Sequence, residues 1–97
     1  MKVYISGPIT GVEDYMENFA EAEKRLKEDF ERVVVINPAK VNYMMPEETT
    51  YEEFMRMAFC MLEMCDTIYM LKGWEKSCGA NREYGYALAK DYTIIME

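Results

Sequence analysis

The sequence predicts an α/β fold of the flavodoxin-like type, a three-layer α/β/α arrangement with a four-stranded parallel sheet. Short apolar runs alternate along the chain with amphipathic stretches of helical period, which is the pattern of successive βαβ units. Right-handed crossovers between these units give the strand order 2-1-3-4. The 97 residues suffice for one compact core, so we expect residues 1–97 to form a single domain.

The first half of the chain predicts a strand, a loop, a helix and a second strand. Residues 3–6 form a strand-like run, and the loop at 7–11 contains glycine and proline. Helical spacing of large apolar side chains, with acidic residues near the start, predicts a helix over about 14–29. The β-branched run at 33–36 predicts a buried second strand, which Asn37-Pro38 brings to an end.

The second half opens with a connection and a capped helix. Proline and scattered polar groups over residues 39–50 favour an irregular connection, a flap over the site to which we assign no regular structure. Thr50 and Glu53 fit a capping box that opens a helix to about residue 64. The remaining elements are a buried third strand at 67–71, a loop at 72–79, a helix at about 79–90 and a fourth strand at 92–96.

Composition excludes several classes of partner. The net charge of −7 disfavours polymeric nucleic acid, because neutralising many phosphates requires a basic surface. No apolar run approaches the roughly 18 residues of a membrane span, and the N-terminus begins as a strand, so we expect a cytoplasmic protein that binds no membrane. Three cysteines without metal-binding spacing, and no histidine, favour reduced thiols and no metal site.

Two loops should form a binding site. In open parallel sheets, ligands bind beyond the carboxyl ends of the strands at the point where the strand order reverses, which brings residues 6–11 and 73–79 together. Gly7, Pro8 and Gly11 lie where the chain must turn from strand to helix, and Thr10 adds a hydroxyl there. A plain turn without a ligand explains the same residues.

The second loop leads into a helix with a carboxylate in its early turns. Ser77 places a hydroxyl at the helix start, where free backbone N–H groups bind anions, and Glu83 follows one turn inside. Taken alone, a glutamate at this place is more often a surface charge that the helix dipole stabilises.

Three segments together resemble the nucleoside 2-deoxyribosyltransferase-like superfamily, and within it a short bacterial and phage branch related to deoxynucleoside 5′-monophosphate N-glycosidases. They are residues 4–11, Asn37-Pro38 and residues 65–87, where the pattern Ser-x-Gly-x-x-x-Glu-x-Gly-x-Ala carries most of the likeness. The resemblance implies a small nucleoside or nucleotide as substrate, no cofactor, and a homo-oligomer.

The resemblance also implies roles for residues. Glu83 matches the glutamate that attacks the sugar and forms a covalent ester, and Tyr4 matches the tyrosine that positions it. Trp74 is placed to stack on a base or to cover the site, although a lone exposed tryptophan also suits an interface. The residues expected to bind substrate are Ser6, Gly7, Pro8, Thr10, Gly11, Asn37, Trp74, Ser77 and Gly79.

One departure keeps three readings open. The family's proton-handling aspartate lies eight residues before the position of Asp66, and here that place is Ala58. Glu63, Glu75 or a carboxylate from residues 39–50 would have to replace it, and Asp66 itself is expected to be structural. The readings are an N-glycosidic hydrolase or transferase, a nucleotide-binding sensor, and an assembly protein that uses the methionine-rich helix at 51–64.

Overall fold

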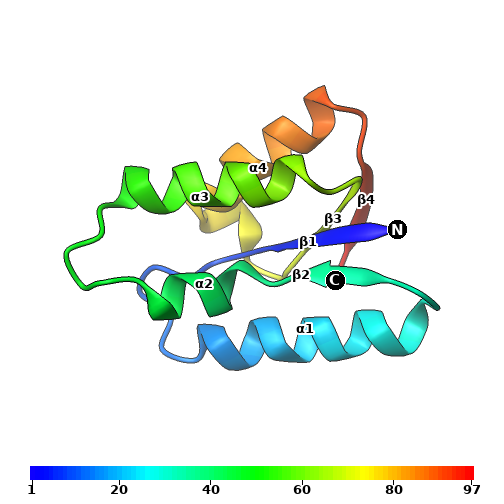
Figure 1. Ribbon diagram of the computed structural model, residues 1–97, viewed down its shortest axis with the longest axis horizontal. Coiled ribbons are helices and arrows are strands. Elements are labelled where there is room, and N and C mark those ends of the chain that lie inside the picture. Colours follow the sequence, from blue (N-terminus) through cyan, green and yellow to red (C-terminus); the bar gives the residue numbers. More distant parts are fainter.

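The computed structural model describes residues 1–97 and confirms the predicted fold (Figure 1). All strand pairs are parallel, and the sheet has the order β2-β1-β3-β4. The elements are β1 (Lys2–Ser6), α1 (Tyr15–Asp29), β2 (Val34–Ile36), α2 (Pro38–Met44), α3 (Tyr51–Glu63), β3 (Thr67–Met70), a short 3-10 helix η1 (Trp74–Lys76), α4 (Cys78–Ala89) and β4 (Thr93–Met96).

Two apolar cores lie on opposite faces of the sheet, as in a three-layer fold. Helix α1 covers one face, and helices α3 and α4 cover the other (Figure 1). Side chains alternate along β1, so that Val3 and Ile5 belong to the core under α1 whereas Tyr4 belongs to the core under α3 and α4. The alternation places every second residue of the central strand on the α4 side.

Side-chain caps fix where α3 and α4 begin. The Thr50 hydroxyl accepts the Glu53 N–H at 3.1 Å, and the Glu53 carboxylate accepts the Thr50 N–H at 2.8 Å, which confirms the predicted capping box. The Ser77 hydroxyl accepts the Ala80 N–H at 3.2 Å and caps α4. Both helices start at the end of the molecule where β1 and β3 finish (Figure 1).

Two predictions about the middle of the chain are wrong. The connection at 39–50 is not wholly irregular, because α2 occupies its first part, with Asn37 as N-cap and Pro38 at the first helical position. Proline suits that position, since its fixed φ is helical and no N–H is needed there. Strand β2 is an edge strand of three partly exposed residues rather than a buried one.

No helix is both long enough and apolar enough to cross a membrane.

Candidate functional site

A buried carboxylate lies at the carboxyl end of β1. Glu83, on α4, is only 7% exposed. Its Oε2 accepts a hydrogen bond from the Tyr4 hydroxyl at 2.6 Å, and its Oε1 accepts one from the Ser6 hydroxyl at 2.6 Å. Both carboxylate oxygens are thereby held, and the group cannot rotate freely.

The periods of strand and helix explain why these three side chains meet. Tyr4 and Ser6 are two residues apart on β1, so both point to the face that α4 covers. Glu83 lies on the buried side of α4 with Ala80 and Ala87, whose small side chains let the helix approach the sheet closely. The cluster is therefore a product of the fold and not of neighbouring positions in the chain.

Burial changes the acidity of this cluster. Loss of hydration raises the pKa of Glu83 to about 7, although the hydrogen bonds from Ser6 and Tyr4 and the charge of Arg82 act in the opposite direction. Burial and the adjacent carboxylate raise the pKa of Tyr4 well above its usual value, so the phenol stays protonated and keeps donating. Near neutral pH, Glu83 can therefore exchange a proton.

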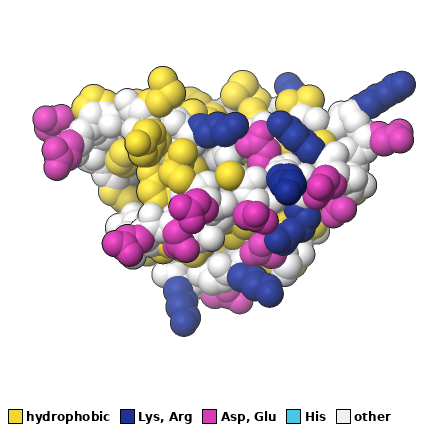
Figure 2. All heavy atoms as spheres, turned by 90° about the horizontal axis from the view of Figure 1, so that it is seen from below, with side chains coloured by type: hydrophobic (Ala, Val, Ile, Leu, Met, Phe, Trp, Pro, Cys, Tyr) yellow, Lys and Arg dark blue, Asp and Glu magenta, His cyan; other side chains and the backbone are white.

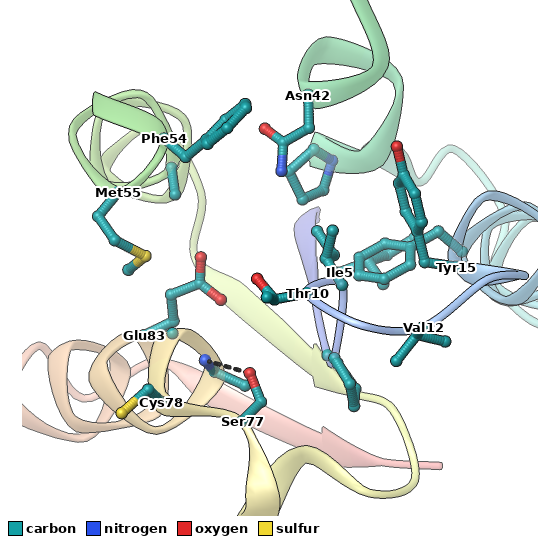
Figure 3. Close-up of a pocket in the computed structure, with 18 of the residues that line it drawn as sticks. Ile5, Thr10, Val12, Tyr15, Asn42, Phe54, Met55, Ser77, Cys78 and Glu83 are labelled. Carbon is teal, nitrogen blue, oxygen red and sulfur yellow. Dashed lines mark hydrogen bonds between the residues drawn. The ribbon is translucent and has the colours of Figure 1, made fainter. Parts of the chain in front are cut away.

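A cavity of about 710 Å³ opens beside Glu83. Figure 3 shows Glu83, Thr10 and Asn42 directed towards its middle from α4, the β1–α1 loop and α2. Of the residues predicted from sequence, seven line it: Tyr4, Gly7, Pro8, Thr10, Ser77, Gly79 and Glu83. The structure thus brings the two predicted loops together at one cavity.

Two of those lining residues are glycines for packing reasons. A Cβ on Gly7 would come within 2.7 Å of the Leu71 side chain, so glycine lets β1 leave the sheet beside the end of β3. A Cβ on Gly79 would lie 3.2 Å from the Met55 sulfur, so glycine lets α4 begin close to α3. The close packing at both glycines therefore helps to form the wall of the cavity.

Four other predicted residues do not line the cavity. Ser6 donates its hydrogen bond to the Glu83 carboxylate without lining the cavity itself, and Asn37 caps α2. Gly11 takes a left-handed conformation with φ of 77°, which suits a turn. The Trp74 ring packs on Tyr84, with ring centroids 4.6 Å apart, instead of facing the cavity.

Several lining residues escaped the sequence analysis. Asn42 projects its amide into the cavity, and no hydrogen bond joins that amide to the other residues drawn (Figure 3). Lys76 contributes a cation at the mouth. Recognising the Asn-Pro pair as a helix cap would have predicted α2, and with it a face carrying Asn42. The remaining unforeseen side chains that line the cavity include Tyr15, Tyr51, Phe54, Met55 and Cys78.

Residues 1–96 match the family DUF4406, whose description is "domain of unknown function". The chain belongs to the DUF4406 family. None of the curated proteins compared with this DUF4406 chain matches it.

The DUF4406 chain also resembles a solved structure, from work on the 2-deoxyribosyltransferase of the bacterium Bacillus psychrosaccharolyticus. The TM-score is 0.75 at 15% sequence identity, over 99% of this chain and 71% of the other. At this identity the likeness shows a shared fold.

The cavity of the DUF4406 chain holds one carboxylate. Ala58 lines it with a methyl group, and among all lining residues only Glu83 is acidic. The carboxylates considered as replacements, Glu63 and Glu75, do not line the cavity, and neither does any carboxylate of residues 39–50. Asp66 accepts hydrogen bonds from the Lys2 N–H at 3.2 Å and the Thr67 hydroxyl at 2.7 Å, and so joins the starts of β1 and β3.

Proposed function

We propose that this protein breaks or transfers the N-glycosidic bond of a deoxynucleoside or its 5′-monophosphate, with Glu83 as the nucleophile. The observation that carries the proposal is the carboxylate of Glu83, which is buried at the wall of a large cavity and held by the hydroxyls of Tyr4 and Ser6 at 2.6 Å each. A carboxylate kept largely from water and fixed in direction is suited to attack a sugar carbon.

The reaction proceeds through two displacements at one carbon. A carboxylate oxygen of Glu83 bonds to C1′ of the sugar while the C1′–N bond breaks, and the base leaves with the bonding electrons and takes up a proton from solvent. Water, or the nitrogen of a second base, then attacks C1′ and gives up a proton to solvent, while the bond between C1′ and Glu83 breaks and releases the carboxylate. Each step passes through an oxocarbenium-like transition state, and the two inversions give overall retention.

The two ends of the cavity suit the two ends of a nucleotide. The α4 start presents Ser77, Gly79 and backbone N–H groups, with Lys76 close by, and this combination favours an anionic or hydroxyl-rich group. On the opposite side the unpaired amide of Asn42 offers both a donor and an acceptor, which complements the edge of a base. Apolar and aromatic side chains between them accommodate a flat ring.

Release of free base tests the proposal. The protein is incubated with the common deoxynucleosides and their 5′-monophosphates, and free base is followed by chromatography. We expect release by the native protein and a loss of about 10³-fold or more in Glu83→Gln, because the nucleophile is removed while its shape is kept. Glu63→Gln changes an exposed carboxylate on α3 and is the matched control. Equal release by native protein and Glu83→Gln would contradict the proposal.

A second function is favoured by Ala58. General acid assistance to a leaving base is worth roughly 10²–10⁴ in rate, and no second carboxylate lines this cavity. A protein that binds nucleotides as a sensor needs the cavity without that assistance. Saturable binding in calorimetry, with no base released by the native protein, would establish this function in place of the first.

A further inference from the structure

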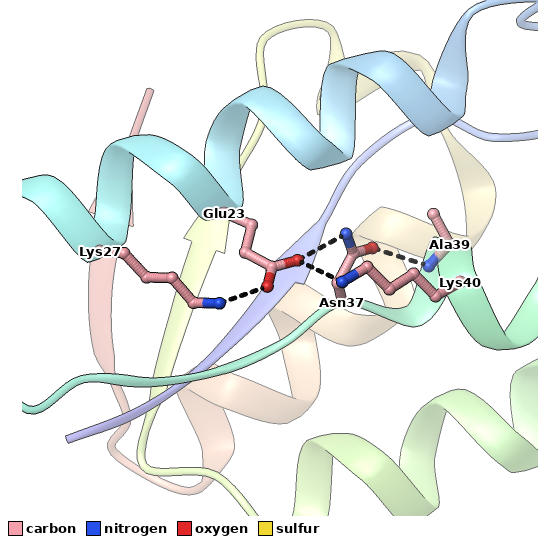
Figure 4. A network of polar contacts seen from close by, with 5 residues as sticks. All are labelled: Glu23, Lys27, Asn37, Ala39 and Lys40. Carbon is pink, nitrogen blue, oxygen red and sulfur yellow. Dashed lines mark hydrogen bonds and ion pairs between the residues drawn. The ribbon is translucent and has the colours of Figure 1, made fainter.

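Glu23 lies at the centre of a polar network that the proposed chemistry does not use (Figure 4). Its side chain, on α1, is 13% exposed and accepts contacts from three groups. These are the Lys27 ammonium at 2.8 Å, the Lys40 ammonium at 3.2 Å and the Asn37 amide nitrogen at 3.1 Å. The network joins α1 to the first turn of α2.

The network also sets the direction of a helix cap. A carboxylate only accepts hydrogen bonds, so it turns the NH₂ of Asn37 towards Glu23 and the amide oxygen the other way. That oxygen accepts the Ala39 N–H at 3.1 Å and caps α2. Partial burial raises the pKa of Glu23, but the contacts with Lys27, Asn37 and Lys40 prevail and lower it to about 2. The carboxylate is therefore charged throughout the physiological range.

Helix α2 depends on such contacts for its position. It has only seven residues, fewer than a helix needs to persist by itself in water. Pro38 and Asn42 of this helix line the cavity, and Asn42 lies opposite Glu83 (Figure 3). A small rotation of α2 would therefore redirect the Asn42 amide without disturbing Glu83 or its two hydroxyl partners.

We propose that Glu23 is a positioning residue, which fixes α2 against α1 and thereby sets where Asn42 meets the ligand. The inference rests on the proposed function for the identity of that ligand. Pro38 and Ala39 also anchor α2 through burial, so the two contributions must be separated experimentally.

Hydrogen exchange separates the contribution of Glu23 from that of the buried Pro38 and Ala39, and it needs no substrate. In Glu23→Gln we expect amide exchange in residues 39–44 to rise about tenfold, as for the loss of a helix cap, with no change in α4. Lys40→Met removes one partner and should produce a smaller rise in the same segment. Glu28→Gln, an exposed carboxylate on the same helix, is the matched control and should behave as native protein. Unchanged exchange in Glu23→Gln would overturn the inference.

Ligand binding then tests the consequence at the cavity. In the base-release assay we expect Glu23→Gln to raise KM about fivefold to tenfold while kcat changes less than twofold, because the nucleophile is untouched. Where the native protein binds nucleotide without release, Kd should rise by the same factor. Faster exchange in α2 with unchanged KM or Kd would show that Glu23 only stabilises the helix, and would overturn its role at the site. If native protein neither binds nor cleaves nucleotides, the proposed function fails, whereas the exchange result still decides whether Glu23 positions α2.

Discussion

The carboxyl group of Glu83 should make the fold less stable as the pH rises. Burial raises its pKa to about 7 in the folded protein, against about 4.5 in an unfolded chain. Below about pH 4.5 the group is protonated in both states, so it costs nothing. Above that pH the unfolded chain ionises first, and stability falls until the pH passes about 7, by about 3 kcal/mol in total.

Glu83→Gln removes this penalty and serves as the test. Urea unfolding should show the variant about 2–3 kcal/mol more stable than native protein at pH 8, with little gain at pH 4. The glutamine amide fills the same space, and the hydroxyls of Tyr4 and Ser6 can turn to meet it. A variant that is less stable than native protein at pH 8 would show that the carboxylate is not penalised by burial.

Ser6 should lower the pH at which Glu83, the proposed nucleophile, becomes ionised. Its hydroxyl bonds to Oε1 of Glu83 and favours the ionised form, whereas burial opposes ionisation. In Ser6→Ala, with Tyr4 and Arg82 still facing the carboxylate, we expect the acidic limb of the kcat/KM profile to move up by about one pH unit. Tyr4→Phe should move the acidic limb in the same direction. If the limb stays at the native pH in both variants, the ionisation of Glu83 does not control the activity.

At the scale of elements, α3 carries the position where a second carboxyl group could act in the proposed reaction. Ala58 faces the cavity from this helix and is 7% exposed. We expect Ala58→Asp to raise base release by roughly 10²-fold or more, because a second carboxyl group can protonate the leaving base. Ala58→Asn, which has the same size without the acid, is the control. If both variants release base at the native rate, proton donation from α3 does not limit the reaction.

Sequence periodicity predicted most elements, because the pattern of each is local. Helix α1 and strand β3 agree with prediction within two residues, and the Thr50 capping box is as expected. The pattern does not predict helix α2, because the same Asn37-Pro38 pair both ends β2 and begins the helix. Proline after a strand usually indicates a turn, and it favours a helix only when it occupies the first helical position. The direction of the Asn42 amide into the cavity and the packing of Trp74 on Tyr84 depend on tertiary contacts, which leave no periodic pattern in the chain.

The whole molecule has an uneven surface that bears on assembly. Figure 2 shows the face seen from below in Figure 1, where hydrophobic side chains gather towards one end and charged side chains cover much of the rest. Tyr43 and Met44 on α2 are 71% and 82% exposed, whereas Met55 of the methionine-rich helix is buried at the cavity. The predicted homo-oligomer should therefore be tested through α2 and not through Met55.

Sedimentation tests whether the protein forms an oligomer through α2. We expect the native protein to sediment as a dimer or larger, and Met44→Glu to shift it towards the monomer, because a buried unpaired charge opposes association. Ala20→Glu adds the same charge at an exposed site on α1 and should leave the oligomer unchanged. A native monomer, or a Met44→Glu protein that sediments as native protein does, would contradict the prediction.

The alternation of side chains along β1 has a practical consequence for protein engineering. Val3 packs in the core under α1 with Ala22 and Leu26, and none of these three lines the cavity, whereas Tyr4 and Ser6 point to the other face. A combinatorial library confined to the first set can therefore be screened for thermostability while Tyr4 and Ser6 stay in place. The two faces of one strand therefore allow the stability of the fold and the lining of the cavity to be changed separately.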